Sequence, residues 1–168
     1  AFAQTWLAEG HRVGLLTYGR HIERTPPGYG KLQRERILRA LAQARIGDHP
    51  MFADLEYLPT RLFPPRSQLV LVSPLGSDDY PTIRMLRARG YAVAIVSPDP
   101  IRFEQRVLGD GGSVELAAKL LHTERRLLLR QLRAVGVHVV DWDVEGPLER
   151  AVHRTWKRSP LRTAPQRR

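Results

Sequence analysis

The sequence predicts an α/β fold in which a mostly parallel sheet carries helices on both faces. The run 69–72 is apolar at consecutive positions, which is typical of a strand covered on both sides; 91–97 is expected to be another buried strand, and 137–142 the last strand. Segments with helical periodicity separate these runs, and the alternation of strands with helices indicates a parallel sheet. The 168 residues are enough for one domain with its own core.

The segment before these runs is expected to contain the end of a helix, two strands and a loop. We expect the helix end over 2–9, a buried strand over 12–19, and an antiparallel edge strand over 21–24. Gly14 allows close packing within the buried strand. Residues 25–30 (TPPGYG) are expected to form a loop, because proline has no N–H to donate to a strand ladder.

Helices are expected where apolar residues recur with helical spacing. In residues 31–45 the apolar face is expected to consist of Ile37, Leu38, Leu41 and Ala42. Further helices are expected over 52–58, from Pro81 to Gly90, over 113–135 and over 147–156.

The longest of these helices, residues 113–135, has both a start and a stop signal. Ser113 is expected to act as its N-cap, and Gly136 follows its last turn as the terminating glycine. We expect residues 1–156 to form one domain. The tail, 157–168, contains five basic residues and no acidic one, and with its prolines it is expected to be disordered.

The net charge of +10 rests almost entirely on arginine, because only three of the 27 basic residues are lysine. Arginine suits phosphate recognition, so one class of function is binding to nucleic acid or to an anionic membrane surface. Its best support is the tail together with four arginines of the long helix, of which the last three share a face: Arg125, Arg126, Arg130 and Arg133. The wide dispersion of the other arginines, and the lack of interleaved aromatic residues, favour a helix face that meets solvent or a protein partner.

The sequence lacks the residues or motifs that several kinds of catalytic and binding site require. There is no cysteine, which excludes disulfides and a cysteine nucleophile, and there is no G-x-S-x-G motif. Residues 109–113 (GDGGS) precede a helix but lack the P-loop lysine, so they favour a flexible lead-in over a phosphate site. No pair of histidines has the spacing of a local metal motif: His11, His21, His49, His122, His138 and His153.

Four segments, taken in order, resemble the domain-of-unknown-function family 58. They are 12–42, with a strand ending in "YG" and a "PGxGxxQ"-like loop, then 65–75, 86–100 and 135–152. Members of that family are von Willebrand factor A-like proteins, typically found beside MoxR-type AAA+ ATPases. The resemblance covers most of residues 1–152. It implies a von Willebrand factor A-like fold and a role in protein interaction.

The resemblance also implies a first strand with a D-x-S-x-S motif, whose oxygens suit a hard divalent cation. That motif is absent from this sequence, so we expect the chain to lack the strand and to be the C-terminal part of a longer protein, whose upstream region could hold membrane anchors. The family takes further ligands from a middle loop and from a serine-aspartate pair after a later strand. The middle loop here, 47–55, contains no serine or threonine, and Ser73-Pro74 stands where the pair is expected. We therefore expect a degenerate metal-ion-dependent adhesion site, with no metal ligand and no cofactor-binding residue.

Five aspartates could offer carboxylates near strand ends. Asp78 and Asp79 follow the run 69–72, and we interpret them as residues that favour the start of the next helix. Asp99, between two prolines, is expected to be a turn residue. Asp141 and Asp143 flank Trp142, and strand alternation would place both on one side, as two-metal chemistry needs. No third acidic residue stands at a fixed spacing from them.

These observations favour a non-enzymatic, cytoplasmic adaptor that works with a MoxR-type AAA+ ATPase. No catalytic residue is assigned. Its contact surface is expected at the carboxyl ends of the strands, in loops 25–30, 47–52 and 73–80. The alternative is the arginine-rich binder of nucleic acid or anionic membrane. A second alternative is a metal-dependent hydrolase that uses Asp78, Asp79, Asp141 or Asp143.

Overall fold

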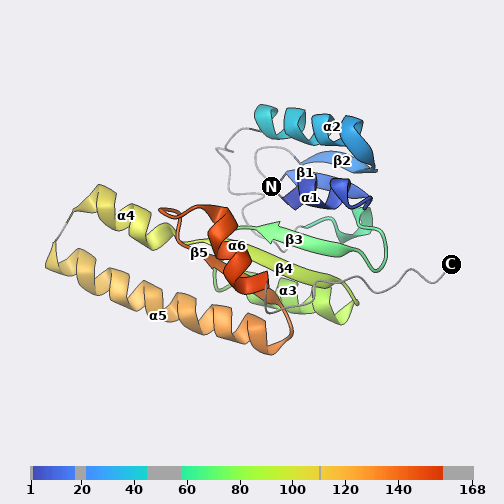
Figure 1. Ribbon diagram of the computed structural model, residues 1–168. Coiled ribbons are helices and arrows are strands. Elements are labelled where there is room, and N and C mark those ends of the chain that lie inside the picture. Colours follow the sequence, from blue (N-terminus) through green and yellow to red (C-terminus); the bar gives the residue numbers. More distant parts are fainter. Residues whose placement is uncertain (1, 18–21, 45–57, 110, 157–168) are drawn as a thin grey trace. The chain divides into compact units, whose positions relative to one another are not determined.

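The computed structural model describes residues 2–17, 22–44, 58–109 and 111–156 (Figure 1). The chain divides after Leu58 into two compact units, Ala1–Leu58 and Pro59–Arg168. The division falls inside the range for which we expected a single domain. The expected short helix over 52–58 lies almost wholly outside the described residues.

The first unit is a two-stranded antiparallel sheet with two helices. Its elements are α1 (Phe2–Ala8), β1 (Val13–Thr17), β2 (Glu23–Gly28) and α2 (Gly30–Gln43). β1 pairs with β2 in a sheet of its own, so the predicted strand is confirmed over Val13–Thr17, and so is the antiparallel return. The strand was expected to be buried, but its residues are only partly covered or exposed. α1 and α2 pack against each other and against this hairpin.

The prediction that residues 25–30 form a loop is wrong, because Pro26 and Pro27 lie inside β2. The strand tolerates them because the pairing shifts there: Val13 is opposite Gly28, whereas Leu15 is opposite Thr25. The two prolines thus sit in an irregularity of an edge strand, where no ladder donor is required of them.

Gln33 of α2 supplies the donors that this irregular stretch lacks. Its Nε2 donates to the carbonyl oxygens of Val13 and Pro26, each at 2.8 Å, and the residue is only 2 % exposed. A Cβ on Gly28 would lie 2.6 Å from Gln33 Oε1, so the glycine leaves room for the glutamine. The "PGxGxxQ"-like stretch therefore has a physical role in closing the hairpin onto its helix.

The apolar face expected for α2 is largely wrong. Ile37 is buried, but Leu38 and Leu41 remain about half exposed, at 51 % and 49 %. The buried face of α2 is built from Ile37 and Gln33, because the helix packs onto backbone carbonyls as well as onto apolar side chains.

The second unit contains a three-stranded parallel sheet in the order β3-β4-β5. Its strands are β3 (Gln68–Val72), β4 (Ala92–Pro98) and β5 (His138–Trp142), and a short 3-10 turn, η3 (Thr60–Leu62), precedes them. β3 pairs with β4 from Gln68↔Ala92 to Val72↔Val96, and β4 pairs with β5 from Ala94↔His138 to Pro98↔Trp142. The predicted parallel sheet is confirmed for these three strands.

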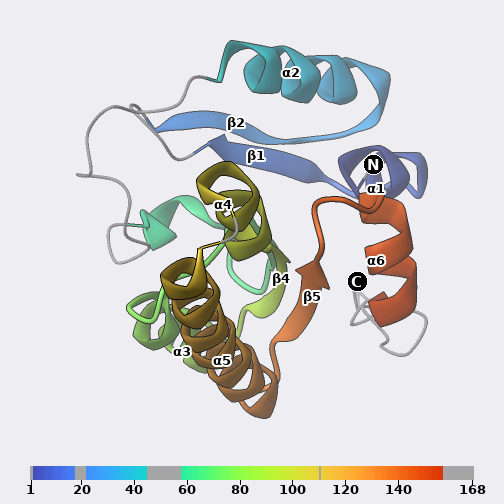
Figure 2. The same ribbon diagram turned by 90° about the vertical axis from the view of Figure 1, so that its left-hand side faces the viewer.

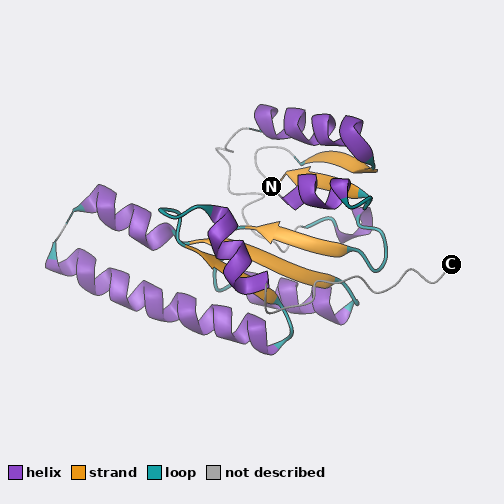
Figure 3. Ribbon diagram, viewed as in Figure 1, coloured by secondary structure: helices purple, strands orange, loops and turns teal. Residues whose placement is uncertain are grey.

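Helices connect and cover the strands (Figure 3), and all of them except α4 were predicted from the sequence. They are α3 (Asp79–Ala88), α4 (Pro100–Leu108), α5 (Gly112–Ala134) and α6 (Leu148–Trp156). Figure 2 shows α3 and α5 on one face of the sheet, and α6 on the other beside β5. The core between them is fully buried and aliphatic: Ile83, Leu86, Ile95, Val96, Leu129, Leu132 and Val140.

Two helix starts differ from the prediction. Gly111, not Ser113, occupies the N-cap position of α5, since the helix begins at Gly112. α4 was not predicted at all, although Asp99-Pro100 is a common start signal, an N-cap acid followed by proline in the first turn. The stop at Gly136 is confirmed: its φ is +79°, and Val137 N–H donates to the Leu132 carbonyl at 3.1 Å.

Candidate functional site

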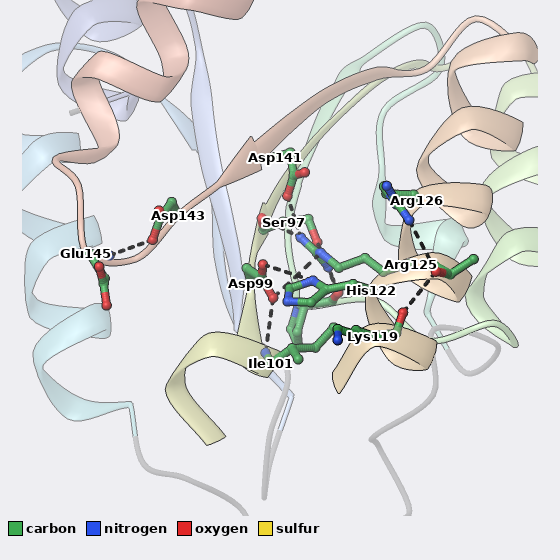
Figure 4. Close-up of polar contacts among 12 residues, drawn as sticks. Ser97, Asp99, Ile101, Lys119, His122, Arg125, Arg126, Asp141, Asp143 and Glu145 are labelled. Atoms are coloured by element: carbon green, nitrogen blue, oxygen red, sulfur yellow. Dashed lines mark hydrogen bonds and ion pairs between the residues drawn. The ribbon is translucent and has the colours of Figure 1, made fainter. Parts of the chain in front are cut away.

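Polar groups from all three parallel strands meet at the carboxyl edge of the sheet, where open α/β folds usually place their sites. Pro74 lies beyond the end of β3, Ser97 lies near the end of β4, Asp99 follows that strand, and Asp141 lies near the end of β5. α5 contributes Arg125, whose guanidinium points to these groups (Figure 4).

Arg125 donates four hydrogen bonds in this cluster. Nη1 donates to the Pro74 carbonyl at 2.9 Å and to Ser97 Oγ at 3.0 Å. Nη2 donates to the Ser97 carbonyl at 3.0 Å and to Asp141 Oδ1 at 2.8 Å. The side chain is only 9 % exposed, and Nε, which has no hydrogen-bond partner, lies 4.0 Å from Asp99 Oδ1. One buried cation thus ties together the ends of three strands.

Asp99 is held in place by local structure and by its neighbours. Its Oδ1 accepts from Ile101 N–H at 3.0 Å, which caps α4, and its own N–H donates to the Trp142 carbonyl at 2.9 Å. Its Oδ2 lies 3.7 Å from His122 Nδ1. The carboxylate is 13 % exposed, so its negative charge faces the guanidinium of Arg125 from inside the protein. The expected turn residue is in fact a helix cap within the cluster.

The cation at the centre of this cluster is the guanidinium of Arg125, which is part of the protein. A guanidinium stays protonated in proteins and offers only donors, so Arg125 is neither a general acid nor a general base. Ser97 Oγ already donates to the Pro74 carbonyl at 3.0 Å and accepts from Arg125, which leaves it without a basic partner to activate it. The cluster is built for cohesion of the strand ends.

The turn after β3 is shaped by its own side chains. Leu75 N–H donates to Ser73 Oγ at 3.3 Å, and Gly76 N–H donates to Asp79 Oδ2 at 2.8 Å. Leu75 has a φ of +62°, a strained conformation for a leucine. Asp79 lies in the first turn of α3, where its charge favours the helix, whereas Asp78 makes no side-chain cap bond.

The structure does not bring the other aspartates together. β5 ends at Trp142, so Asp143 lies beyond the strand and the alternation with Asp141 does not hold. Asp143 Oδ1 accepts from Glu145 N–H at 3.2 Å, and Figure 4 shows it well apart from Asp141. Within the described residues no three histidine, aspartate or glutamate side chains form a group that could hold a metal ion.

The other segments that the sequence singled out do not add side chains to this cluster in the described residues. Residues 47–52 lie outside the described residues, as do His21 and His49. In 109–113, Gly109 has a φ of +79° and the chain enters α5 at Gly112, as a helix lead-in would. Of the four arginines on the long helix, Arg126, Arg130 and Arg133 are exposed, as expected of one face.

Sequence reasoning missed Arg125 as the centre of the cluster. The signal was present: position 125 shares a helix face with Ala118, Leu128, Leu129 and Leu132, all of which are buried. A basic residue on an apolar face needs buried acceptors, and the strand ends supply them.

No family model, curated protein or solved structure matches the chain. In the described part of the chain, no helix is long and apolar enough to cross a membrane.

Proposed function

We propose that the chain is a non-enzymatic protein-interaction module with a degenerate metal site, and that it works alongside a MoxR-type AAA+ ATPase. The observation that carries the proposal is Arg125. In a von Willebrand factor A-like domain the carboxyl edge of the sheet would hold a divalent cation. Here a buried guanidinium occupies that edge and takes up oxygen atoms of Pro74, Ser97 and Asp141.

The charged groups of the cluster are already paired with other groups of the protein, which favours a protein-binding role over catalysis. Both carboxylates near Arg125, those of Asp99 and Asp141, face a fixed positive charge. A nucleophile or a metal-bound water would need a free carboxylate or an open coordination position there. The resemblance to von Willebrand factor A-like proteins then supplies the class of partner.

The finer fold, a von Willebrand factor A-like domain that lacks its first strand, is part of this proposal. Among the described residues β3 pairs only with β4, so one of its edges has unpaired backbone groups, and Val72 on this strand is 66 % exposed. Such an edge accepts a further strand. The strand that carries D-x-S-x-S in the resembled family would be parallel and apolar, and it could pair with the free edge of β3.

We place the contact surface on the turn 73–80, at the carboxyl end of β3. This turn is short, is fixed by internal hydrogen bonds and carries the exposed residues Gly76, Ser77 and Asp78. A pre-organised turn loses little conformational freedom when a partner binds, which favours affinity.

The test is direct binding between the purified chain and a purified MoxR-type ATPase. We expect a complex that survives moderate salt and the addition of EDTA, because no metal takes part. Asp78→Lys should weaken the complex, whereas Glu35→Lys on α2, an equal change of charge at an exposed site, should not.

Three outcomes would contradict the proposal. Release of the ATPase by EDTA would show that a metal takes part. Equal binding by both lysine variants would place the contact elsewhere. Capture of nucleic acid in place of the ATPase, with affinity that falls steeply as salt rises, would favour the arginine-rich binder.

A further inference from the structure

α5 has a second apolar face that the described elements of the fold leave exposed. Leu116, Leu120 and Leu127 are 71 %, 61 % and 53 % exposed, and because they share one helix face they form a contiguous apolar patch. They lie on the side of the helix opposite to Arg125, Leu129 and Leu132, which pack onto the sheet. Successive residues of a helix are separated by about 100°, so the two faces are diametrically opposed.

The exposed face follows a coiled-coil pattern. Positions 116, 120, 123, 127, 130 and 134 are separated alternately by four and three residues, which is the spacing of a heptad seam. Leucine occupies half of these positions, within a helix of 23 residues. α4 packs on another side of α5, around Val114 and Leu121, and leaves the seam uncovered. We call this face, with Leu116, Leu120 and Leu127 at its centre, the leucine seam.

The two borders of the leucine seam carry different charges. One border carries Lys119, Arg126 and Arg133, and Arg130 lies within the seam on the same side. Lys119 is paired with Glu115 at 2.7 Å, but Arg126 contacts only the neutral hydroxyl of Thr123 among the described bonds, at 3.2 Å. The other border carries Glu124 and Gln131. The surface is therefore apolar along its centre and basic along one side.

We infer that the leucine seam binds an amphipathic helix of another protein whose own apolar stripe is bordered by acidic residues. Such a helix would bury the three leucines and place carboxylates beside Arg126, Arg130 and Arg133, as e and g positions do in paired helices. This surface is distinct from the turn 73–80, so the inference does not depend on the proposed function.

A second copy of this chain fits the seam less well. In a parallel pair Arg130 would meet Arg130 of its copy, and in an antiparallel pair the borders with Lys119, Arg126 and Arg133 would face each other. Both arrangements bring like charges together on a chain whose net charge is +10.

An anionic membrane also fits less well. The polar face of a helix that lies on a membrane is rich in lysine and arginine and its apolar face often carries aromatic residues, whereas α5 has no aromatic residue and carries Glu115 and Glu124 beside the seam. An acidic helix places one border beside Arg126, Arg130 and Arg133, and on its other border it meets a single like charge, that of Glu124.

The test uses a designed helical peptide as the probe, with leucine at the a and d positions of its heptads and glutamate at e and g. Repulsion between its glutamates keeps this peptide from pairing with itself. Its lysine counterpart is the control probe. Binding to the full chain is measured by fluorescence anisotropy. We expect the acidic peptide to bind and the basic peptide not to bind.

Matched variants locate the contact. Leu120→Gln should weaken binding by about tenfold or more, as loss of a central interface residue does. Val107→Gln, on α4 and 71 % exposed, should leave it unchanged. Arg126→Glu should also weaken binding, whereas Arg84→Glu on α3 should not.

The inference is overturned if the acidic peptide does not bind, or if it binds equally to Leu120→Gln. It is also overturned if light scattering shows a dimer that Leu120→Gln dissociates, which would make a second copy the occupant. Binding to phosphatidylserine vesicles that depends on Leu120, without binding to the peptide, would instead make the surface a membrane contact.

Discussion

Arg125 and Asp141 form an ion pair with an Nη2–Oδ1 distance of 2.8 Å, and their exposure to water is very unequal. The side chain of Arg125 is 9 % exposed, whereas that of Asp141 is 49 % exposed. The arginine is therefore fixed by the interior of the strand ends, and the aspartate closes the cluster from the solvent side. Removing one partner should have a very different effect from removing the other.

Arg125→Met should lower the free energy of unfolding of the second unit by about 3–5 kcal/mol, because it leaves the Pro74 and Ser97 carbonyls without their donor and the Asp99 carboxylate without the positive charge beside it. Asp141→Asn should cost about 1 kcal/mol or less, since water can solvate the remaining groups on the exposed side. Hydrogen exchange of the β4 amides measures both.

Arg126→Met is the matched control for this pair, because Arg126 follows Arg125 on the same helix but is exposed. It should change stability by no more than about 0.5 kcal/mol. If Arg125→Met proved as mild as Arg126→Met, the cluster would not hold the strand ends together.

Asp99 has two roles that two substitutions separate. Asp99→Asn retains an oxygen that can accept from Ile101 N–H but removes the charge that faces Arg125 and His122. Asp99→Ala removes both, so it should cost about 1 kcal/mol more than Asp99→Asn, the usual contribution of an N-cap. Thermal unfolding followed by circular dichroism compares the two. Equal losses would show that the cap contributes nothing to stability.

Glu115 and Lys119 give a pH-dependent prediction. The hydrogen bond from Lys119, followed by its charge, lowers the pKa of Glu115 below the ordinary glutamate value. A lowered carboxyl pKa stabilises the folded state above the pKa of the unfolded chain, and this contribution is lost as pH falls through the folded pKa. Because Glu115 is fully exposed, the pair is screened by salt.

We therefore expect the NMR titration midpoint of the Glu115 carboxyl to rise in Lys119→Met. It should also rise in the unaltered chain when salt is added. A midpoint that neither change moved would mean that the pair does not form in solution.

The sequence predicted the parallel sheet because each of its strands can be identified from its own residues, without knowledge of the strands with which it pairs. The run ending near Ser97 is buried at successive positions, and the runs ending near Val72 and Trp142 have apolar residues at successive positions in their centres, a pattern that arises from the strand's own burial. The ends of the helices before Gly90 and Gly136 could also be predicted from local sequence, since glycine is the residue that most readily adopts the positive φ found at both positions.

What the sequence did not predict depends on contacts between distant residues. Pro26 and Pro27 join a strand only because Gln33, seven and six positions later, satisfies the hairpin from a helix. Arg125 becomes a site residue only because three strands end around it. Spacing along the chain indicates that position 125 is buried but not which oxygens meet it there.

Substitutions at Gln33 and Gly28 test whether contacts between residues distant in the sequence hold the hairpin to α2. Gln33→Ala removes the two hydrogen bonds to Val13 and Pro26 and should destabilise the first unit by about 1–3 kcal/mol. Gln33→Glu should cost more, because an ionised carboxylate cannot donate and would face two carbonyl oxygens. Hydrogen exchange of the β1 and β2 amides reports the change.

Gly28→Ala tests the same contact from the other side. The added Cβ would lie 2.6 Å from Gln33 Oε1, and Gln33 cannot move away without breaking its two hydrogen bonds. The substitution should therefore be costly alone and milder in a Gln33→Ala background, with a coupling of about 0.5 kcal/mol or more in a double-mutant cycle. Additive losses would show that the two residues do not share a contact, and the role assigned to the glycine would then be wrong.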